Sequence, residues 1–320
     1  MQRRIGARTF DFDREVAVMA VINRTPDSFY DKGSTFALDK AVSAALAAAH
    51  DGADWVDIGG VPFGRGPVVS LDEELERVVP VVAAISAESD VVISVDTFNA
   101  QVAKASIAAG AAVINDTSGL WDPDMTSVVA ASDATLVLTH SLQPPRAEPA
   151  RPEYGDVVDD VVAFLREKVA RAEAEGIPRE RLIVDPGHDL NKNTFHSLEI
   201  TRRLREVVAI GLPTLAAVSN KDFVGETLDR EQGQRLEGSL AAAVFCILEG
   251  ARIVRMHNVR ASVDAVHMTE AMLGWREPAW TMHNLGVAAP VLASSGDARR
   301  GSVQRGSARR GSAVVGSAGE

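Results

Sequence analysis

Residues 91–116 read VVISVDTFNAQVAKASIAAGAAVIND, and this stretch contains one complete unit of the fold. Its first part, 91–95, is rich in β-branched residues, as buried strands are, and 99–109 is an alanine-rich stretch with helical periodicity. Gly110 follows, where a residue able to adopt the left-handed conformation ends a helix. A second strand-like run then begins at 112, so the stretch predicts the strand–helix–strand unit of parallel α/β sheets.

The same alternation occurs eight times along the chain. The strand-like runs are 17–22, 55–58, 91–95, 112–114, 135–138, 182–184, 214–218 and 252–254, and the helical stretches are 38–51, 71–87, 99–109, 123–131, 156–175, 195–209, 236–249 and 261–274. Helix ends are marked by Gly52, Gly176, Gly211 and Gly250, and a capping-box spacing at Ser70 predicts a helix start. Eight such units predict an α/β fold of the closed TIM (β/α)8 barrel type. An open doubly wound sheet is disfavoured because no G-x-G-x-x-G motif follows the first strand.

The 320 residues divide into three parts by pattern. We expect an N-terminal lead-in over 1–14 and the barrel over 15–286. Residues 287–320 repeat Arg-Gly-Ser without apolar periodicity and are expected to form a disordered tail.

Charge and composition exclude several classes of partner. A net charge of −11 with 5% aromatic residues provides neither the basic surface nor the stacking platforms of a nucleic-acid-binding protein. The apolar run 16–22 is far shorter than the roughly 20 residues that span a bilayer, and acidic residues interrupt any export signal. We therefore expect a cytoplasmic protein with no membrane partner. The single cysteine, Cys246, lies in an apolar helical run and is expected to be inert packing.

Polar residues stand at the end of every predicted strand. They are Asn23, Asp57, Asp96, Asn115, Asp116, His140, Asp185, Ser219, Asn220, Lys221, Arg255 and His257. In a barrel these ends carry the chemistry, although frayed strand ends also need polar residues for structural reasons alone. The carboxylates and amides suit a flat heterocycle with several N–H donors, whereas the guanidinium and imidazole on the last strand suit an oxyanion such as phosphate.

Two hypotheses for a metal site follow from these residues. Asn23 offers an oxygen ligand for a magnesium ion that bridges phosphate oxygens. His140, His188 and Asp185 lie on loops of adjacent strands and offer a zinc site, but no short His-x-x-x-His or cysteine spacing supports it.

Seven motifs in chain order resemble those of the dihydropteroate synthase family over residues 15–276. They are VINRTPDSF at 21–29, DIGG at 57–60, ISVDT at 93–97, IND at 114–116, DPG at 185–187, S-x-K at 219–221 and R-x-H at 255–257. The resemblance implies a TIM barrel, commonly a homodimer, that condenses 6-hydroxymethyl-7,8-dihydropterin pyrophosphate with para-aminobenzoate in folate biosynthesis.

The resemblance also implies roles for individual residues. Asp96, Asn115, Asp185 and Lys221 correspond to pterin contacts. Asn23, Arg255 and His257 correspond to the magnesium and pyrophosphate site, and Lys221, Arg255 and His257 are the candidate catalytic residues.

The departures from the family pattern concentrate around the second substrate. Where the family has Glu-Ser-Thr-Arg-Pro-Gly, this chain has VPFGRG at 61–66, with Pro62, Phe63 and Gly64 at the altered positions. The family segment Asp-Pro-Gly-x-Gly-Phe-Gly-Lys reads DPGHDLNK at 185–192, so Leu190 replaces the aromatic residue and two glycines acquire side chains. Asn220 replaces the family arginine. We therefore expect a divergent second-copy homologue with weak or absent synthase activity.

Three other functions are weighed against this one. The first is an active synthase with an altered loop, and the second is a non-catalytic binder of a pterin or a sulfonamide-like ligand. The third, a pterin-binding methyltransferase barrel, is disfavoured because a methyl transfer has no pyrophosphate for Arg255 and Asn23 to hold.

Overall fold

A computed structural model describes residues 1–23, 34–61, 68–147 and 151–284, without the side chains of 23 and 34–37. The chain divides into a unit over Met1–Glu277, which contains the barrel, and a unit over Pro278–Glu320. The predicted tail, 287–320, lies outside the described residues.

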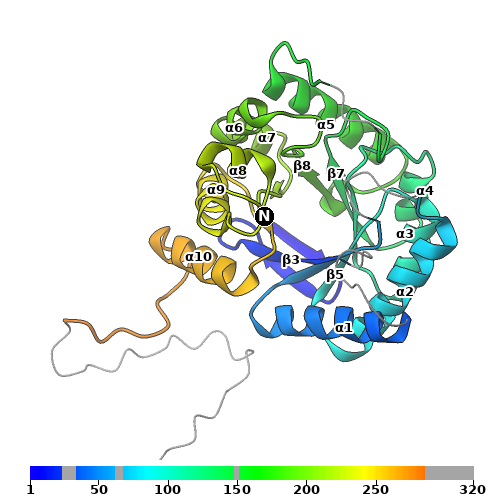
Figure 1. Ribbon diagram of the computed structural model, residues 1–320, viewed down its shortest axis with the longest axis horizontal. Coiled ribbons are helices and arrows are strands. Elements are labelled where there is room, and N and C mark those ends of the chain that lie inside the picture. The colour runs from blue at the N-terminus through cyan, green and yellow to red at the C-terminus, as the bar shows by residue number, and fades with distance from the viewer. Residues whose placement is uncertain (24–33, 62–67, 148–150, 285–320) are drawn as a thin grey trace, which may run out of the picture. The chain divides into compact units, whose positions relative to one another are not determined.

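Eight parallel strands form the barrel, and helices form a ring around them (Figure 1). The strands are β3 (Ala17–Asn23), β4 (Trp55–Gly59), β5 (Val92–Asp96), β6 (Val113–Asp116), β7 (Thr135–Thr139), β8 (Leu182–Asp185), β9 (Leu215–Ala216) and β10 (Ile253–Met256). They pair in the order β8-β7-β6-β5-β4-β3-β10-β9, and a parallel bridge between Val184 and Thr214 joins the two ends. The predicted TIM barrel is confirmed.

The helices follow the strands in the predicted alternation. They are α1 (Ser34–His50), α2 (Leu71–Glu88), α3 (Ala100–Ala109), α4 (Met125–Ala130), α5 (Val157–Ala174), the short 3-10 helix η2 (Arg179–Arg181), α6 (Thr194–Arg202), α7 (Leu204–Val208), α8 (Asp222–Leu228), α9 (Leu236–Leu248) and α10 (Val259–Met272). The helix predicted at 195–209 is two helices, α6 and α7, and the short α8 after β9 was not predicted.

The predicted helix start at Ser70 and helix end at Gly110 are both found in the structure. Ser70 is the N-cap of α2, and its side chain accepts a hydrogen bond from the Glu73 N–H at 3.2 Å. Gly110 has φ 117°, and a Cβ at this position would overlap the Ser86 side chain. Glycine is therefore required there both by conformation and by space.

Alternation along the strands separates two apolar layers. Side chains such as Val56, Ile58 and Val95 point outward and pack under the helices. The inward layer contains Trp55, Val92, Val113, Val137 and residues of the other strands. Because the side-chain period of a strand is two, the residues two positions further along must also point inward, toward the carboxyl ends of the strands.

An N-terminal hairpin lies beneath the inward layer, where the sequence predicted only a lead-in. Its strands are β1 (Gln2–Ile5) and β2 (Arg8–Asp11), paired antiparallel. Phe10 is fully buried and packs edge-on against Trp55, with ring centroids 5.8 Å apart, and stacks on Phe12. The hairpin thus joins the apolar core inside the barrel, and the opposite end is left to polar side chains.

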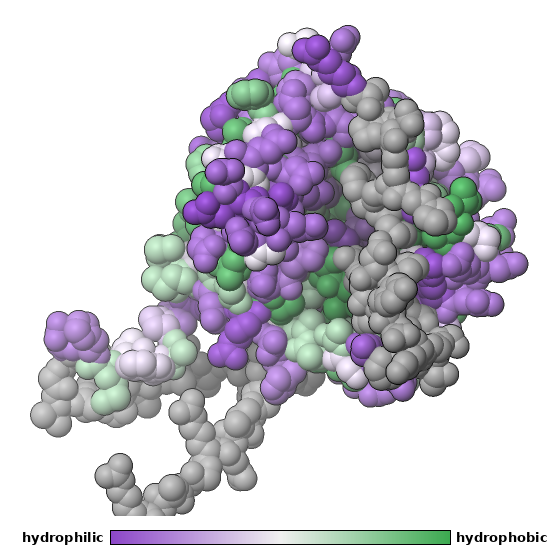
Figure 2. Space-filling view, in the orientation of Figure 1, coloured by the Kyte–Doolittle hydropathy of each residue, from purple (hydrophilic) through white to green (hydrophobic). Residues whose placement is uncertain are grey.

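Two smaller expectations concern the exterior and the cysteine. The face shown in Figure 2 is mostly hydrophilic, and within the described ranges no helix is long and apolar enough to cross a membrane. Cys246 is fully buried in α9, and burial raises the pKa of its thiol to about 12. Its predicted role as inert packing is consistent with both facts.

Candidate functional site

The inward layer becomes polar toward the carboxyl ends of the strands. Asp57 lies two residues after Trp55, Asn115 two after Val113 and Asp185 two after Ile183, so each shares the inward direction of a barrel-core residue. The same spacing relates Asp96 and Arg255 to the inward side of their strands. One rule of strand geometry therefore gathers polar side chains from separate strands into one place.

Arg255 is the centre of this polar layer. Its Nε donates to Asp57 Oδ2 at 2.6 Å, and a terminal nitrogen donates to Asp96 Oδ2 at 3.1 Å. Asp57 is fully buried and also accepts from Ser94 Oγ at 2.6 Å and from Asn115 Nδ2 at 3.1 Å. A partly buried cation is thus held by two carboxylates, and Asp57 accepts three hydrogen bonds in all.

The two carboxylates differ in their surroundings. Asp57 is fully buried and does not line the cavity, whereas Asp96 is a quarter exposed in its side chain and does. Burial raises the pKa of Asp96 to about 7 despite the opposing effect of Arg255. Burial alone disfavours the charged form of Arg255, but Asp57 and Asp96 together raise its pKa above the ordinary value. Near neutral pH, Asp96 can therefore either accept or donate a hydrogen bond.

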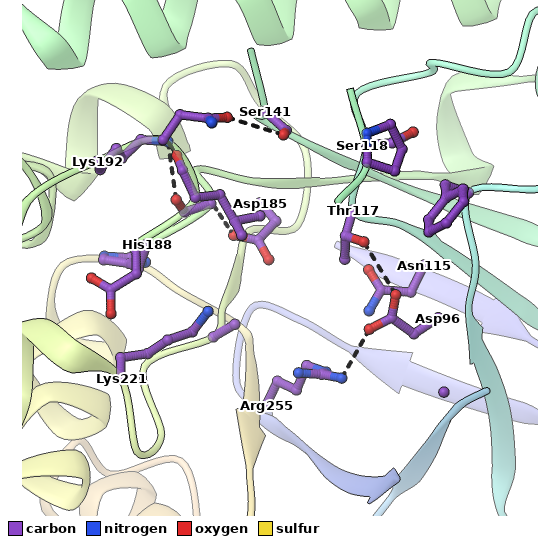
Figure 3. Close-up of a pocket in the computed structure, with 18 of the residues that line it drawn as sticks. Asp96, Asn115, Thr117, Ser118, Ser141, Asp185, His188, Lys192, Lys221 and Arg255 are labelled. Carbon is purple, nitrogen blue, oxygen red and sulfur yellow. Dashed lines mark hydrogen bonds and ion pairs between the residues drawn. The ribbon is translucent and has the colours of Figure 1, made fainter. Parts of the chain in front are cut away.

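A cavity of about 570 Å3 opens over this layer. Asp96 and Asn115 lie on one side of it and Asp185 and Lys221 on the other, with Arg255 between the two sides (Figure 3). Six of the predicted ligand contacts therefore line one cavity: Asp96, Asn115, Asp185, Lys221, Arg255 and His257.

One buried acceptor in this cavity has no protein donor among the residues that the structure describes, and a buried carboxylate lies on the opposite side of the same cavity. Asn115 is 1% exposed, and its Oδ1 makes no hydrogen bond although its Nδ2 is bound to Asp57. Asp185 is 4% exposed; its Oδ1 accepts from the Gly187 N–H at 2.7 Å, and burial raises the pKa of the carboxyl. A buried acceptor without a partner is costly, so Asn115 Oδ1 is suited to an N–H group of a ligand, and the Asp185 carboxylate can accept a further hydrogen bond because each of its oxygens has two lone pairs.

The three basic side chains at the cavity, Lys221, Arg255 and His257, differ in how readily they carry a positive charge. Burial lowers the pKa of Lys221, and Figure 3 shows its side chain reaching into the space between Asp185 and Arg255. His257 is exposed at the rim of the cavity, yet partial desolvation and the positive charges of Arg255 and Lys221 lower its pKa to about 4, so the ring is neutral at pH 7. Its Nδ1 lies 3.0 Å from Ser219 Oγ. Of these three side chains, Arg255 is therefore the one that keeps its positive charge most firmly, because its pKa is raised whereas the other two are lowered.

The zinc hypothesis is not supported by the geometry. Lys192 Nζ contacts His140 Nδ1 at 2.7 Å, and His188 Nε2 lies 3.2 Å from Thr201 Oγ1. Across the described part of the chain, no group of three His, Cys, Asp or Glu side chains is placed to hold a metal ion. These histidines are buried parts of the loop framework, and burial lowers the pKa of His140 to about 2 and of His188 to about 3.

The residues predicted to be altered around the second substrate are only partly described. Leu190 is 6% exposed and Asn220 is half-buried with φ 57°, and both line the cavity. Pro62, Phe63 and Gly64 lie outside the described residues, and so does the side chain of Asn23, whose backbone ends β3 opposite Gly59.

The sequence did not reveal two of the residues that organise this site. Asp57 was placed at a strand end without a role, although its inward position directly after Trp55-Val56 is a usable signal. Lys192 was quoted only within a motif; its Nζ donates to the carbonyl oxygens of Gly187 and Leu190 and thereby shapes the loop after β8.

Comparisons with known proteins agree with this geometry. The model of a family described as "Pterin binding enzyme" matches residues 19–257. A protein of Mycobacterium tuberculosis named "Inactive dihydropteroate synthase 2" is 46% identical over 84% of this chain and 86% of its own length. The dihydropteroate synthase of Escherichia coli is 38% identical over 81% of this chain and 93% of its own length.

A solved structure extends the similarity to three dimensions. The dihydropteroate synthase of Xanthomonas albilineans with 4-aminobenzoic acid superposes with a TM-score of 0.79 at 37% identity, covering 85% of this chain and 98% of the other. Because the family model, the sequence relatives and the barrel all agree, this chain belongs to the dihydropteroate synthase family of pterin-binding enzymes.

Proposed function

We propose that this protein binds a pterin-type ligand and has weak or absent dihydropteroate synthase activity. The observation that carries the proposal is the unpaired, buried Asn115 Oδ1, which shares one cavity with the buried Asp185 carboxylate. A pterin ring carries several N–H donors at its edge and satisfies acceptors of this kind. Lys221 adds a donor on the same side as Asp185.

We propose further that the phosphate end of such a ligand binds at Arg255 and His257. Arg255 is shared by two carboxylates, which limits its attraction for an anion. Because the pKa of Asp96 is raised, a bound anion can shift this carboxyl to its neutral, protonated form. Arg255 is then neutralised by Asp57 alone and attracts the anion more strongly. A magnesium ion held by Asn23 and phosphate oxygens would supply additional charge neutralisation; this rests on the family resemblance.

The second-substrate side supports the loss of activity. Leu190 and Asn220 occupy positions where the family pattern has an aromatic ring and an arginine, so a stacking surface and a cation are both missing. Each lost contact of about 1.4 kcal/mol in the transition state lowers the rate tenfold. The relatives in Mycobacterium tuberculosis and Mycobacterium leprae that share 46% and 44% identity are themselves named inactive.

A homodimer in the cytoplasm is part of the same proposal. The resemblance implies the dimer, and exposed apolar side chains on two adjacent helices are available for an interface: Phe245 and Leu248 on α9, with Met268 and Met272 on α10. Light scattering of the purified full chain measures the mass and decides between one copy and two.

Calorimetry and a sensitive condensation assay test the proposed function together. Pterin pyrophosphate is expected to bind, whereas para-aminobenzoate alone is not, and the condensation product should form far more slowly than with the Escherichia coli enzyme measured in parallel. Robust turnover would instead establish an active synthase. Failure to bind pterin pyrophosphate with and without magnesium would refute the proposed ligand.

A further inference from the structure

Two residues in the loop between β8 and α6 occupy the left-handed backbone region without being glycine. Asp189 has φ 64° and Asn191 has φ 52°. These are the two positions at which the family pattern has glycine. Asp and Asn enter this region more readily than other side-chain-bearing residues, yet glycine remains the least strained choice. Both side chains should therefore make interactions that compensate for the strain.

The Asp189 side chain connects this loop to the next one around the barrel. Its Oδ2 accepts hydrogen bonds from the backbone N–H groups of Asp222 at 2.6 Å and of Phe223 at 3.3 Å, at the start of α8. Its Oδ1 accepts from Ser197 Oγ at 2.8 Å. Asp189 lies four residues after Asp185, and Asp222 directly follows Lys221. One carboxylate thus joins the segment that carries Asp185 to the segment that carries Lys221.

The Asn191 side chain anchors the same loop on its other side. Its Oδ1 accepts from the Leu142 N–H at 2.8 Å and from Ser141 Oγ at 3.1 Å, both in the loop after β7. Its backbone carbonyl accepts from the Tyr154 hydroxyl at 2.8 Å. Leu190, between the two anchors, is thereby held in the wall of the cavity.

We propose that Asp189 is a positioning residue that holds Lys221 in place relative to Asp185, and that Asn191 anchors the same loop from the opposite side. The proposal rests on the proposed function, because the two positioned groups matter only if both contact a pterin-type ligand. A loop fixed at both sides loses less conformational entropy when the ligand binds, so affinity rises without a new ligand contact. The two residues that replace the family glycines, Asp189 and Asn191, then serve one common role, which is to hold this loop in place.

Three variants separate the hydrogen bonds of Asp189 from its backbone conformation and its charge. Asp189→Gly removes the side chain and relieves the backbone. Asp189→Asn keeps an acceptor oxygen for the α8 amides and removes the charge. Asp229→Gly is the matched control, because Asp229 also has φ 53°, is exposed, and lies at the far end of α8 outside the cavity lining.

Two readouts are measured on the full chain. The first is hydrogen exchange of the Asp222 and Phe223 amides without ligand. The second is the dissociation constant of 6-hydroxymethylpterin pyrophosphate by calorimetry. Asp189→Gly is expected to speed exchange and weaken binding, each about tenfold, the effect of one hydrogen bond of about 1.4 kcal/mol. Asp189→Asn should restore most of both, and Asp229→Gly should change neither.

Each contrary result overturns a defined part of the inference. Unchanged exchange in Asp189→Gly refutes the connection between the loops, and faster exchange with unchanged affinity refutes the positioning role. An Asp189→Asn variant that behaves like Asp189→Gly shows that charge matters and the acceptor does not. If the wild-type protein does not bind the probe, the proposed function fails, while exchange in the ligand-free variants still reports on the connection.

Discussion

Replacing Asp57 by Asn tests the buried centre of the site most directly. Asp57 is fully buried and Arg255 is 17% exposed in its side chain, so their ion pair is shielded from water. In the wild type, Asp57 accepts hydrogen bonds from Arg255, Ser94 and Asn115. Asparagine at this position keeps one acceptor oxygen but places an N–H2 group against donors. Breaking one partner of a buried pair typically costs about 3–5 kcal/mol.

Asp96 reduces this cost without removing it. It retains one hydrogen bond to Arg255 at 3.1 Å, so we expect a loss at the lower end, about 3 kcal/mol in the free energy of unfolding. The assay is urea unfolding at pH 7, with the midpoint and the slope fitted together. Asp264→Asn is the control, because Asp264 and Arg260 form an exposed pair at 3.9 Å, and such pairs contribute about 0–1 kcal/mol. A loss below about 1 kcal/mol in Asp57→Asn, equal to the control, would show that the buried pair does not organise the barrel interior.

Three further predictions concern the ligand, the pH dependence and the thiol. Asp185→Asn is expected to weaken pterin pyrophosphate binding at least about tenfold with an almost unchanged urea midpoint, and an unchanged dissociation constant contradicts the assigned role. Because the pKa of Asp96 is raised in the native protein, the unfolded chain releases this proton at lower pH than the native protein does. The free energy of unfolding of the wild type should therefore fall relative to that of Asp96→Asn as pH rises from about 4 to 7. A difference between the two proteins that does not change with pH would refute this. Cys246 should react with a thiol reagent only after unfolding, and rapid labelling of the native protein would contradict its burial.

Local signals were sufficient for most of the barrel and insufficient at its two ends. The repeated unit could be recognised because several outer helices are followed by a glycine, as at Gly110, and because buried strands are rich in β-branched residues. The β1–β2 hairpin was missed because Phe10 and Phe12 become core residues only against Trp55, some 45 positions away in the chain (residue 10 to residue 55). The α8 helix was missed because its start is stabilised by Asp189, a residue of another loop.

The sequence by itself determined the class of fold, the family and which end of the barrel carries polar groups. These properties depend on periodicity and on motifs that are short in sequence, so neighbouring residues are enough to read them. Only the tertiary structure decided how those groups pair: Arg255 with Asp57 across 198 positions of chain, and Asp189 with the amide of Asp222 across 33. Hydrogen bonds and ion pairs act over a few ångströms in space, and separation along the chain carries no information about that distance. The same limit explains why the unpaired Asn115 oxygen and the buried Asp185 carboxylate could be placed in one cavity only from the tertiary structure.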